Sequence, residues 1–96
     1  MAPAMIYYYK GEADRRAGVP AEALVWYETV LSTYPFNEWP DAAACGAAEC
    51  YLALGDAATA LAKWTEVIKE GTTNPASARW VEQAKKRMNE TQKGGK

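Results

Sequence analysis

Residues 43–69, AACGAAECYLALGDAATALAKWTEVIK, decide the fold. Alanine, the strongest helix former, is frequent on both sides of Leu54-Gly55-Asp56. Gly55 allows the backbone to turn, and Asp56 can cap the start of a second helix. Because alanines let two helices approach closely, Trp64 can fill the space beside them. The stretch therefore predicts a helical hairpin, which needs neighbouring helices to bury the rest of its apolar surface.

The same pattern occurs a second time, earlier in the chain and at a constant offset of 37 residues. The matching pairs are Gly18 and Gly55, Ala23 and Ala60, Tyr27 and Trp64, Val30 and Val67, and Leu31 and Ile68. Internal similarity at a fixed spacing of this size is typical of stacked helical hairpins. We therefore expect two hairpins of the same design.

Periodicity and turn residues predict an all-α chain of five helices, at about 3–17, 20–33, 40–54, 56–70 and 76–89. Tyr34-Pro35 ends the second helix, because the residue before a proline is disfavoured in helical conformation. No stretch alternates apolar and polar residues, so we expect no strand. The expected organisation is one domain over 1–91, with repeats at about 3–35 and 40–71, a cap helix at 75–90 and a disordered tail at 92–96.

Composition and charge exclude several classes of protein. The chain has 96 residues, 49% of them hydrophobic, and a net charge of −1, as an ordinary small domain has. Six of the eleven basic residues follow Ala78, but this basic end is narrower than a nucleic-acid surface requires. No apolar run is long enough to cross a membrane, and Met1 to Tyr9 does not read as a signal peptide. The compartment stays open between cytoplasm and periplasm.

The sequence offers little for catalysis, metals or cofactors. Histidine is absent, and Cys45 and Cys50 lie five residues apart on one expected helix, where they cannot bridge each other. The isolated glycines form no phosphate loop, and no metal-ligand spacing is present. Glu12 and Glu49 could face each other across two helices, but an open groove would not raise a carboxyl pKa for acid–base work. We expect neither an enzyme nor a bound cofactor.

At these positions the chain resembles the tetratricopeptide repeat (TPR) family over nearly its whole length. In the first repeat the family positions are carried by Gly11, Gly18, Ala23, Tyr27 and Pro35. In the second they are carried by Ala48, Tyr51, Gly55, Ala60 and Trp64. The helix through Val81, Ala84 and Met88 is similar to the solvating cap helix of such arrays. Asp14, Val30, Val67 and Thr72 depart from the usual pattern.

Within that family, the repeats look most like those of bacterial envelope proteins. The linker Tyr34 to Pro40 and the segment AECYLALGDAATALAKWTEVIKE at 48–70 are similar to modules of the Tol-Pal coordinator and of outer-membrane assembly lipoproteins. The resemblance implies two antiparallel TPR hairpins and a cap helix in a right-handed α-solenoid fragment. It also implies a scaffold that binds another protein or a peptide.

The resemblance further implies a concave groove lined by the first helix of each hairpin. Its positions in this sequence are Met5, Tyr8, Tyr9, Glu12, Arg15, Arg16, Ala42, Cys45, Glu49 and Leu52, with Arg79, Glu82 and Lys86 from the fifth helix. These residues lack the concentrated basic clamp that holds a peptide carboxylate, so they give little support to an acidic C-terminal tail as ligand. In the alternative interpretation, Tyr8 and Tyr9 pack on an upstream helix and the charged residues are only solvated.

A second hypothesis is self-assembly, because the first helix is apolar nearly all round. Met5 to Tyr9 supplies five consecutive apolar or aromatic residues, more than the single stripe of a surface helix. This face would then form the interface of a homo-oligomer or pack on the remainder of a larger TPR protein.

Overall fold

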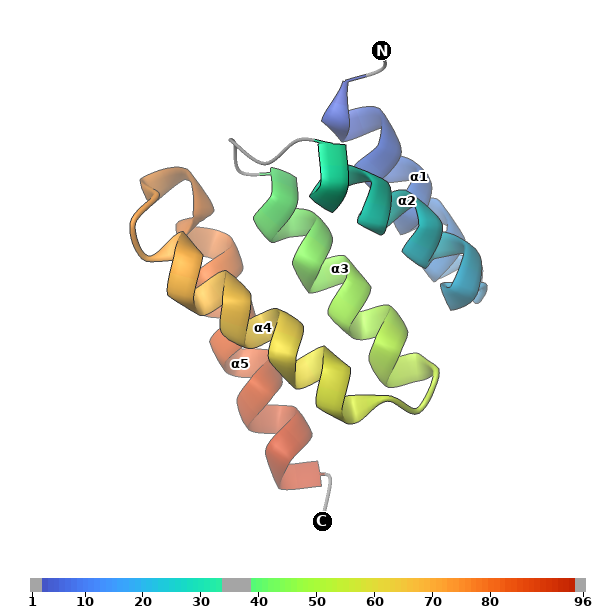
Figure 1. The fold of residues 1–96 in the computed structure, drawn as a ribbon. Helices are drawn as coiled ribbons and strands as arrows, with labels where there is room; N and C mark the ends of the chain where they lie inside the picture. Colours follow the sequence, from blue (N-terminus) through green and yellow to red (C-terminus); the bar gives the residue numbers. More distant parts are fainter. Residues whose placement is uncertain (1–2, 34–38, 95–96) are drawn as a thin grey trace.

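The computed structural model describes residues 3–33 and 39–94, and within these ranges the chain is all-α (Figure 1). The helices are α1 (Ala4–Arg16), α2 (Pro20–Thr33), α3 (Trp39–Ala53), α4 (Ala57–Gly71) and α5 (Ala78–Gly94), with a 3-10 turn, η1 (Pro75–Ser77), before the last. No strand occurs in the described residues. For the part of the chain that the structure describes, the prediction of five α-helices and no strand is confirmed.

The first four helices begin and end close to their expected positions, whereas α5 differs. It begins at Ala78, because Pro75–Ser77 form a 3-10 turn whose first amide bonds to the side chain of Asn74. It continues to Gly94, so Gln92–Gly94 are helical where we expected a disordered tail. The extra turn is supported by the fold, because Thr91 and Gln92 face the same cavity as Leu52 and Leu61. The expected helix end at Tyr34-Pro35 lies outside the described residues.

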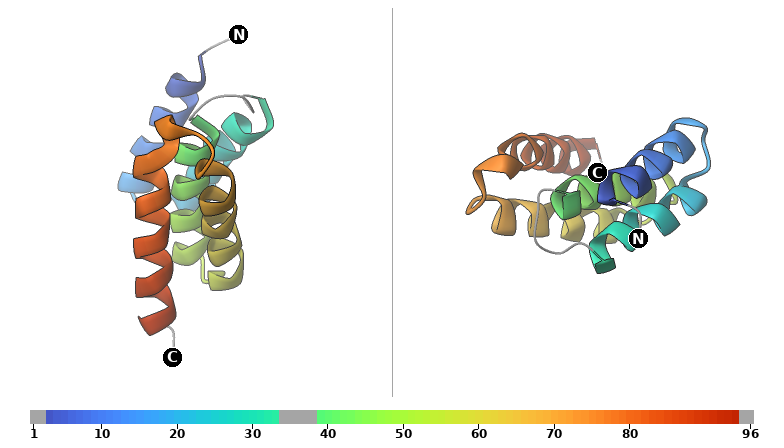
Figure 2. Two further views of the ribbon diagram at one scale, coloured as in Figure 1. Left: turned by 90° about the vertical axis from the view of Figure 1, so that its left-hand side faces the viewer. Right: turned by 90° about the horizontal axis from the view of Figure 1, so that it is seen from above.

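The helices form two layers. Seen from above, α1, α3 and α5 lie along one side and α2 and α4 along the other (Figure 2). Helices that follow each other in the chain pack as neighbours, and α3 also contacts α1 and α5. The molecule is 17 Å thick in its shortest direction, as expected for two layers of helices packed about 8–10 Å apart.

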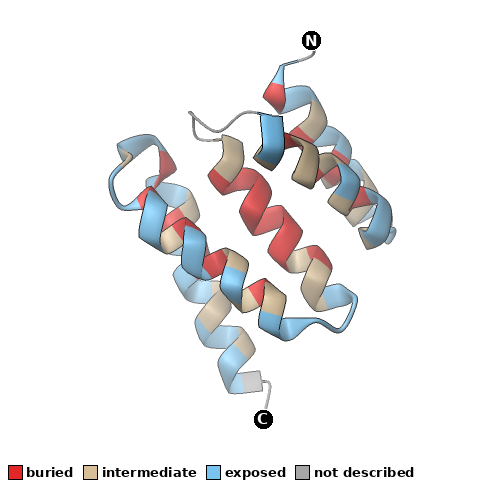
Figure 3. Cartoon of the chain, in the orientation of Figure 1, coloured by how far each residue is buried: buried red, intermediate tan, exposed pale blue. Residues whose placement is uncertain are grey.

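Helix α3 is the most buried part of the chain (Figure 3). All eight residues from Asp41 to Ala48 are buried, five of them alanines and one a glycine. Side chains this small leave room for the four other helices to approach α3 at once. The alanine-rich stretch in the sequence is therefore the centre of the fold.

The two hairpin turns have the same geometry. Gly18 and Gly55 have φ values of +83° and +88°, which a residue with a Cβ adopts at a cost. In each turn the glycine N–H bonds three residues back, and the next N–H bonds five residues back. This is the Schellman arrangement that closes a helix end. The offset found in the sequence therefore corresponds to a structural repeat.

Each hairpin buries one aromatic residue of its second helix, and Tyr27 needs two glycines to do so. A Cβ on Gly11 would come within 2.8 Å of the ring of Tyr27, and a Cβ on Gly46 would come closer still. The ring therefore lies between α1 and α3 and contacts the backbone of both. Trp64 occupies the matching position in the second hairpin and is also fully buried.

Candidate functional site

A cavity of about 190 Å³ lies where α1, α3 and α5 meet, and we call it the central slot. Tyr8, Glu12 and Arg15 line it from α1. Trp80 and Gln83 line it from α5. Between them, α3 presents three small residues, Ala42, Cys45 and Gly46, and the carboxylate of Glu49. The slot therefore has a narrow floor with polar and aromatic walls.

The α1 wall is held by a network around Glu12. Its Oε1 accepts hydrogen bonds from Arg15, at 2.6 Å from the Nη2 atom, and from the Tyr27 hydroxyl at 2.8 Å. Its Oε2 accepts a bond of 3.0 Å from the Tyr8 hydroxyl. Burial acts to raise the pKa of Glu12, but the bonds from Arg15, Tyr27 and Tyr8 together lower it below its usual value. Glu12 is therefore a carboxylate at neutral pH, and it ties α1 to α2.

An ion pair with Arg87 of α5 holds the carboxylate of Glu49. The Nε and Nη2 atoms of Arg87 donate to the two carboxylate oxygens of Glu49 at 2.5 and 2.9 Å. Its Nη1 atom donates to Glu90 at 2.7 Å. A two-point pair of this kind fixes orientation as well as distance. It joins α3 to α5 and sets the direction of the Glu49 carboxylate.

Aromatic rings gather around Tyr8, and two of them, those of Tyr8 and Trp80, line the central slot. The centroid of the Tyr8 ring lies 6.2 Å from that of Trp80, 5.5 Å from that of Trp39 and 5.3 Å from that of Tyr9. These are ordinary separations for tilted and edge-on aromatic pairs. Tyr9 is largely exposed, so the aromatic cluster extends from the slot to the surface of α1.

The cysteine on the floor is not a reactive thiol. Burial, reinforced by the negative charges of Asp41 and Glu49, raises the pKa of Cys45 to about 12. Its Sγ lies 3.7 Å from the carbonyl oxygen of Trp80 and donates to it. Cys50 is also buried, and burial raises its pKa to about 11. Both side chains are therefore neutral thiols at physiological pH and act as small packing residues.

Six of the ten residues that the predicted groove takes from the first and third helices meet at the central slot: Tyr8, Glu12, Arg15, Ala42, Cys45 and Glu49. The other four do not line it. Met5, Tyr9 and Arg16 are exposed on α1, and Tyr9 is joined to the slot only through its ring contact with Tyr8. Leu52 lies further along α3, at a different cavity. Arg79, Glu82 and Lys86 are exposed on α5 and outside the slot.

Sequence patterns did not predict that Gly46, Trp80 and Gln83 line the slot or that Arg87 pairs with Glu49. Gly46 carried a local signal, because a glycine inside a helix is unfavourable unless a close contact requires it. Trp80 and Gln83 are neighbours of the expected positions on α5, and a small rotation of that helix brings them into the slot instead. The partnership of Arg87 with Glu49 had no local signal, since it joins residues from different helices.

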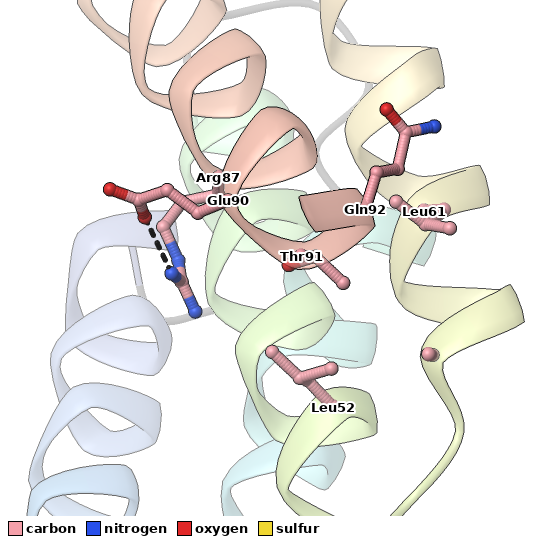
Figure 4. A pocket seen from close by; sticks show the side chains of 7 residues that line it. Leu52, Leu61, Arg87, Glu90, Thr91 and Gln92 are labelled. Atoms are coloured by element: carbon pink, nitrogen blue, oxygen red, sulfur yellow. Dashed lines mark hydrogen bonds and ion pairs between the residues drawn. The ribbon is translucent and has the colours of Figure 1, made fainter. Parts of the chain in front are cut away.

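A larger cavity of about 560 Å³, the distal notch, lies at the opposite end of α3 (Figure 4). Its apolar lining comes from Leu52, Ala57 and Leu61. The last turns of α5 add Arg87, Glu90, Thr91 and Gln92. In Figure 4 the side chains of Arg87 and Glu90 point to one side of α5, while Gln92 lies beside Leu61. The notch is therefore mainly an apolar recess with a polar rim.

Comparison with protein-family models, with curated proteins and with solved structures found no match. Among the described residues, no group of histidine, cysteine and acidic side chains could hold a metal ion. None of the described helices has the length and apolar character needed to cross a membrane.

Proposed function

We propose that this chain is a protein–protein interaction module of the TPR type, and that it binds a segment of another protein over α1, α3 and α5. The observation that carries this proposal is the central slot. Residues chosen from the sequence for a groove converge there from two helices, and α5 completes the walls. The slot supplies hydrogen-bonding groups, and Tyr9 adds exposed aromatic surface beside it through its ring contact with Tyr8, a pairing common in recognition sites.

The chemistry of the slot favours binding over catalysis. Its two carboxylates, Glu12 and Glu49, are each held by an arginine, and the pKa of Glu12 is lowered rather than raised. A general acid needs a raised pKa, and a nucleophilic cysteine needs a lowered one. Recognition of a partner requires only fixed donors, acceptors and apolar surface, all of which the slot supplies.

The test is a selection of binding peptides from a random library on the immobilised protein. We expect the selected peptides to shift NMR amide signals of α1, α3 and α5. Tyr9→Ala should weaken binding by about tenfold, because it removes an exposed aromatic beside the slot. Val25→Ala, which shortens an equally exposed side chain on α2, is the matched control and should leave affinity unchanged. Shifts confined to α2 and α4 would contradict the proposal.

Self-assembly is the second candidate function, favoured by the outer face of α1. Met5, Ile6 and Tyr9 are 47%, 41% and 58% exposed, which is unusual for three large apolar residues on one short helix. In this alternative, α1 of one copy packs on another copy or on a further part of a larger protein.

Sedimentation across a range of concentrations separates the two candidates. If the chain self-associates through α1, Ile6→Glu should dissociate the oligomer, and Val25→Glu on α2 should leave it intact. A chain that stays monomeric at every concentration would contradict self-assembly and leave partner binding as the function to test.

A further inference from the structure

We propose that the central slot takes the side chain of an arginine from the partner segment, with its guanidinium between Glu12 and Glu49 and beside the rings of Tyr8 and Trp80. This inference rests on the proposed function and names the chemistry of the partner. The bound group would be positively charged, whereas an acidic tail would bring a negative charge.

Three carboxylate oxygens of the slot keep hydrogen-bonding capacity in reserve, namely Glu12 Oε2 and both oxygens of Glu49. An ionised carboxylate offers about four acceptor positions. In the described part of the chain, Glu12 Oε1 accepts three bonds, two from Arg15 and one from Tyr27, and Oε2 accepts one, from Tyr8. Each oxygen of Glu49 accepts one, from Arg87. Glu12 and Glu49 occupy equivalent positions on α1 and α3, and both line the slot. A guanidinium with five donors can bond to both walls at once.

The charges around the floor also favour a cation. Three carboxylates lie at or near the floor: Glu12 and Glu49 line the slot and are each held by an arginine, whereas Asp41 lies on α3 outside the slot lining. Asp41 is buried and accepts a hydrogen bond from Ser77, a neutral partner. Burial is the largest cause of the raised pKa of Cys45, and the negative charges of Asp41 and Glu49 raise it further. Arg79 lies over the ring of Trp80 and would repel a cation in the slot. Because Arg79 is exposed, water weakens this repulsion.

The rings and the volume select arginine among the cationic side chains. A planar guanidinium stacks on aromatic faces and pairs with carboxylates, whereas an ammonium is a compact and strongly hydrated charge. Trp80 already has a guanidinium, that of Arg79, at 5.5 Å from its ring centre. The slot volume of about 190 Å³ exceeds several waters at about 30 Å³ each. It is smaller than the usual pocket for a cofactor, about 300–1,000 Å³.

The experiment compares two probes that differ in charge. N-acetyl-arginine amide and N-acetyl-citrulline amide have nearly the same shape, but only the first is cationic. We titrate each into the full chain and follow the NMR amide signals of the slot residues. The expected result is a saturable shift at Cys45 and Glu49 with the arginine probe and none with citrulline at the same concentration. Equal binding of both probes, or shifts away from the slot, would overturn the inference.

Gln83 provides a matched pair of variants. It lines the slot but is exposed, so a change of charge there need not disturb the core. We expect Gln83→Glu to tighten binding of the arginine probe and Gln83→Lys to weaken it, each by about fivefold. Thermal unfolding confirms that both variants fold. An unchanged affinity in two folded variants would overturn the inference.

The failure of this inference can be told apart from failure of the proposed function. Peptides that bind over α1, α3 and α5 without enrichment in arginine would overturn the arginine inference and support the proposed function. Both would be supported if the selected peptides are enriched in arginine and if replacing that arginine with alanine abolishes the NMR shifts of the slot residues. Arginine-probe binding at the slot, with every selected peptide on α2 and α4, would contradict the proposed function alone.

Discussion

The two hairpins place an aromatic side chain at the same position and secure it in different ways. Tyr27 and Trp64 are both fully buried. The hydroxyl of Tyr27 donates to Glu12 and lies within hydrogen-bond distance of Arg15. In the described residues the indole N–H of Trp64 is buried without a hydrogen-bond partner, and the guanidinium of Arg87 lies over its ring. The first hairpin therefore relies on a polar anchor, and the second on packing.

The backbones facing the two rings differ as well. Tyr27 is pressed between Gly11 and Gly46, whereas the residue of the second repeat that matches Gly11 is Ala48. Both hairpins keep the same turn and the same buried small residue, Ala23 or Ala60. The comparison shows that the repeat fixes where the aromatic lies, while its neighbours decide whether polar bonds or packing holds it.

The largest expected effect is the loss of the packed aromatic of the second hairpin. Trp64→Ala should destabilise the chain by about 3–5 kcal/mol, because it opens a cavity in the core. A domain of this size has about 5–15 kcal/mol of stability, so urea unfolding should show a much lower midpoint. Trp26→Ala is the matched control, since Trp26 is only half-buried. An equal loss in the control would contradict the role given to packing at Trp64.

The glycine contact of the first hairpin should produce the next largest effect. Gly46→Ala should destabilise by about 2–3 kcal/mol, because the added methyl group would collide with the ring of Tyr27. Helix propensity alone predicts the opposite sign, a gain of about 1 kcal/mol. Urea unfolding of Gly46→Ala and of the wild type shows directly whether the variant is less stable or more stable. A double-mutant cycle with Tyr27→Leu should show that the penalty shrinks when the ring is removed.

Removing the polar anchor should cost less. Tyr27→Phe should destabilise by about 1–2 kcal/mol, because the buried ring keeps its packing but loses its bond to a charged carboxylate. Tyr51→Phe is the control, since the Tyr51 hydroxyl bonds to the partly exposed Glu28 and should contribute under about 0.5 kcal/mol. Equal losses in the two variants would show that Glu12 does not act as an anchor.

The smallest expected effect is a dependence of stability on pH. The pKa of Glu12 is lower in the folded chain than in the unfolded chain, where it is about 4.3. The ionised group therefore stabilises the fold above that value, and this contribution is lost as the pH falls through the lower folded pKa. Urea unfolding between pH 7 and pH 3 should show a shallower decline in Glu12→Gln than in the wild type. The matched variant Glu66→Gln, at an exposed site on α4, should follow the wild type.

The sequence by itself determined the helices and their turns, because these depend on neighbouring residues. The positive φ of Gly18 and Gly55, the cap at Asp56 and the offset between the repeats all follow from short-range preferences. The same local reasoning placed the end of α5 too early. Its last turn is polar in sequence, and only its position beside α3 and α4 explains its helical structure.

The tertiary structure alone decided which side chains form the candidate site. A helical repeat predicts which residues share a face, but the rotation of each helix about its axis depends on packing with its neighbours. That rotation left Met5 and Arg16 outside the central slot and brought Trp80 and Gln83 into it. The pair between Glu49 and Arg87 and the anchor of Tyr27 on Glu12 join different helices. Such contacts depend on distances through space, which the order of residues along the chain does not specify.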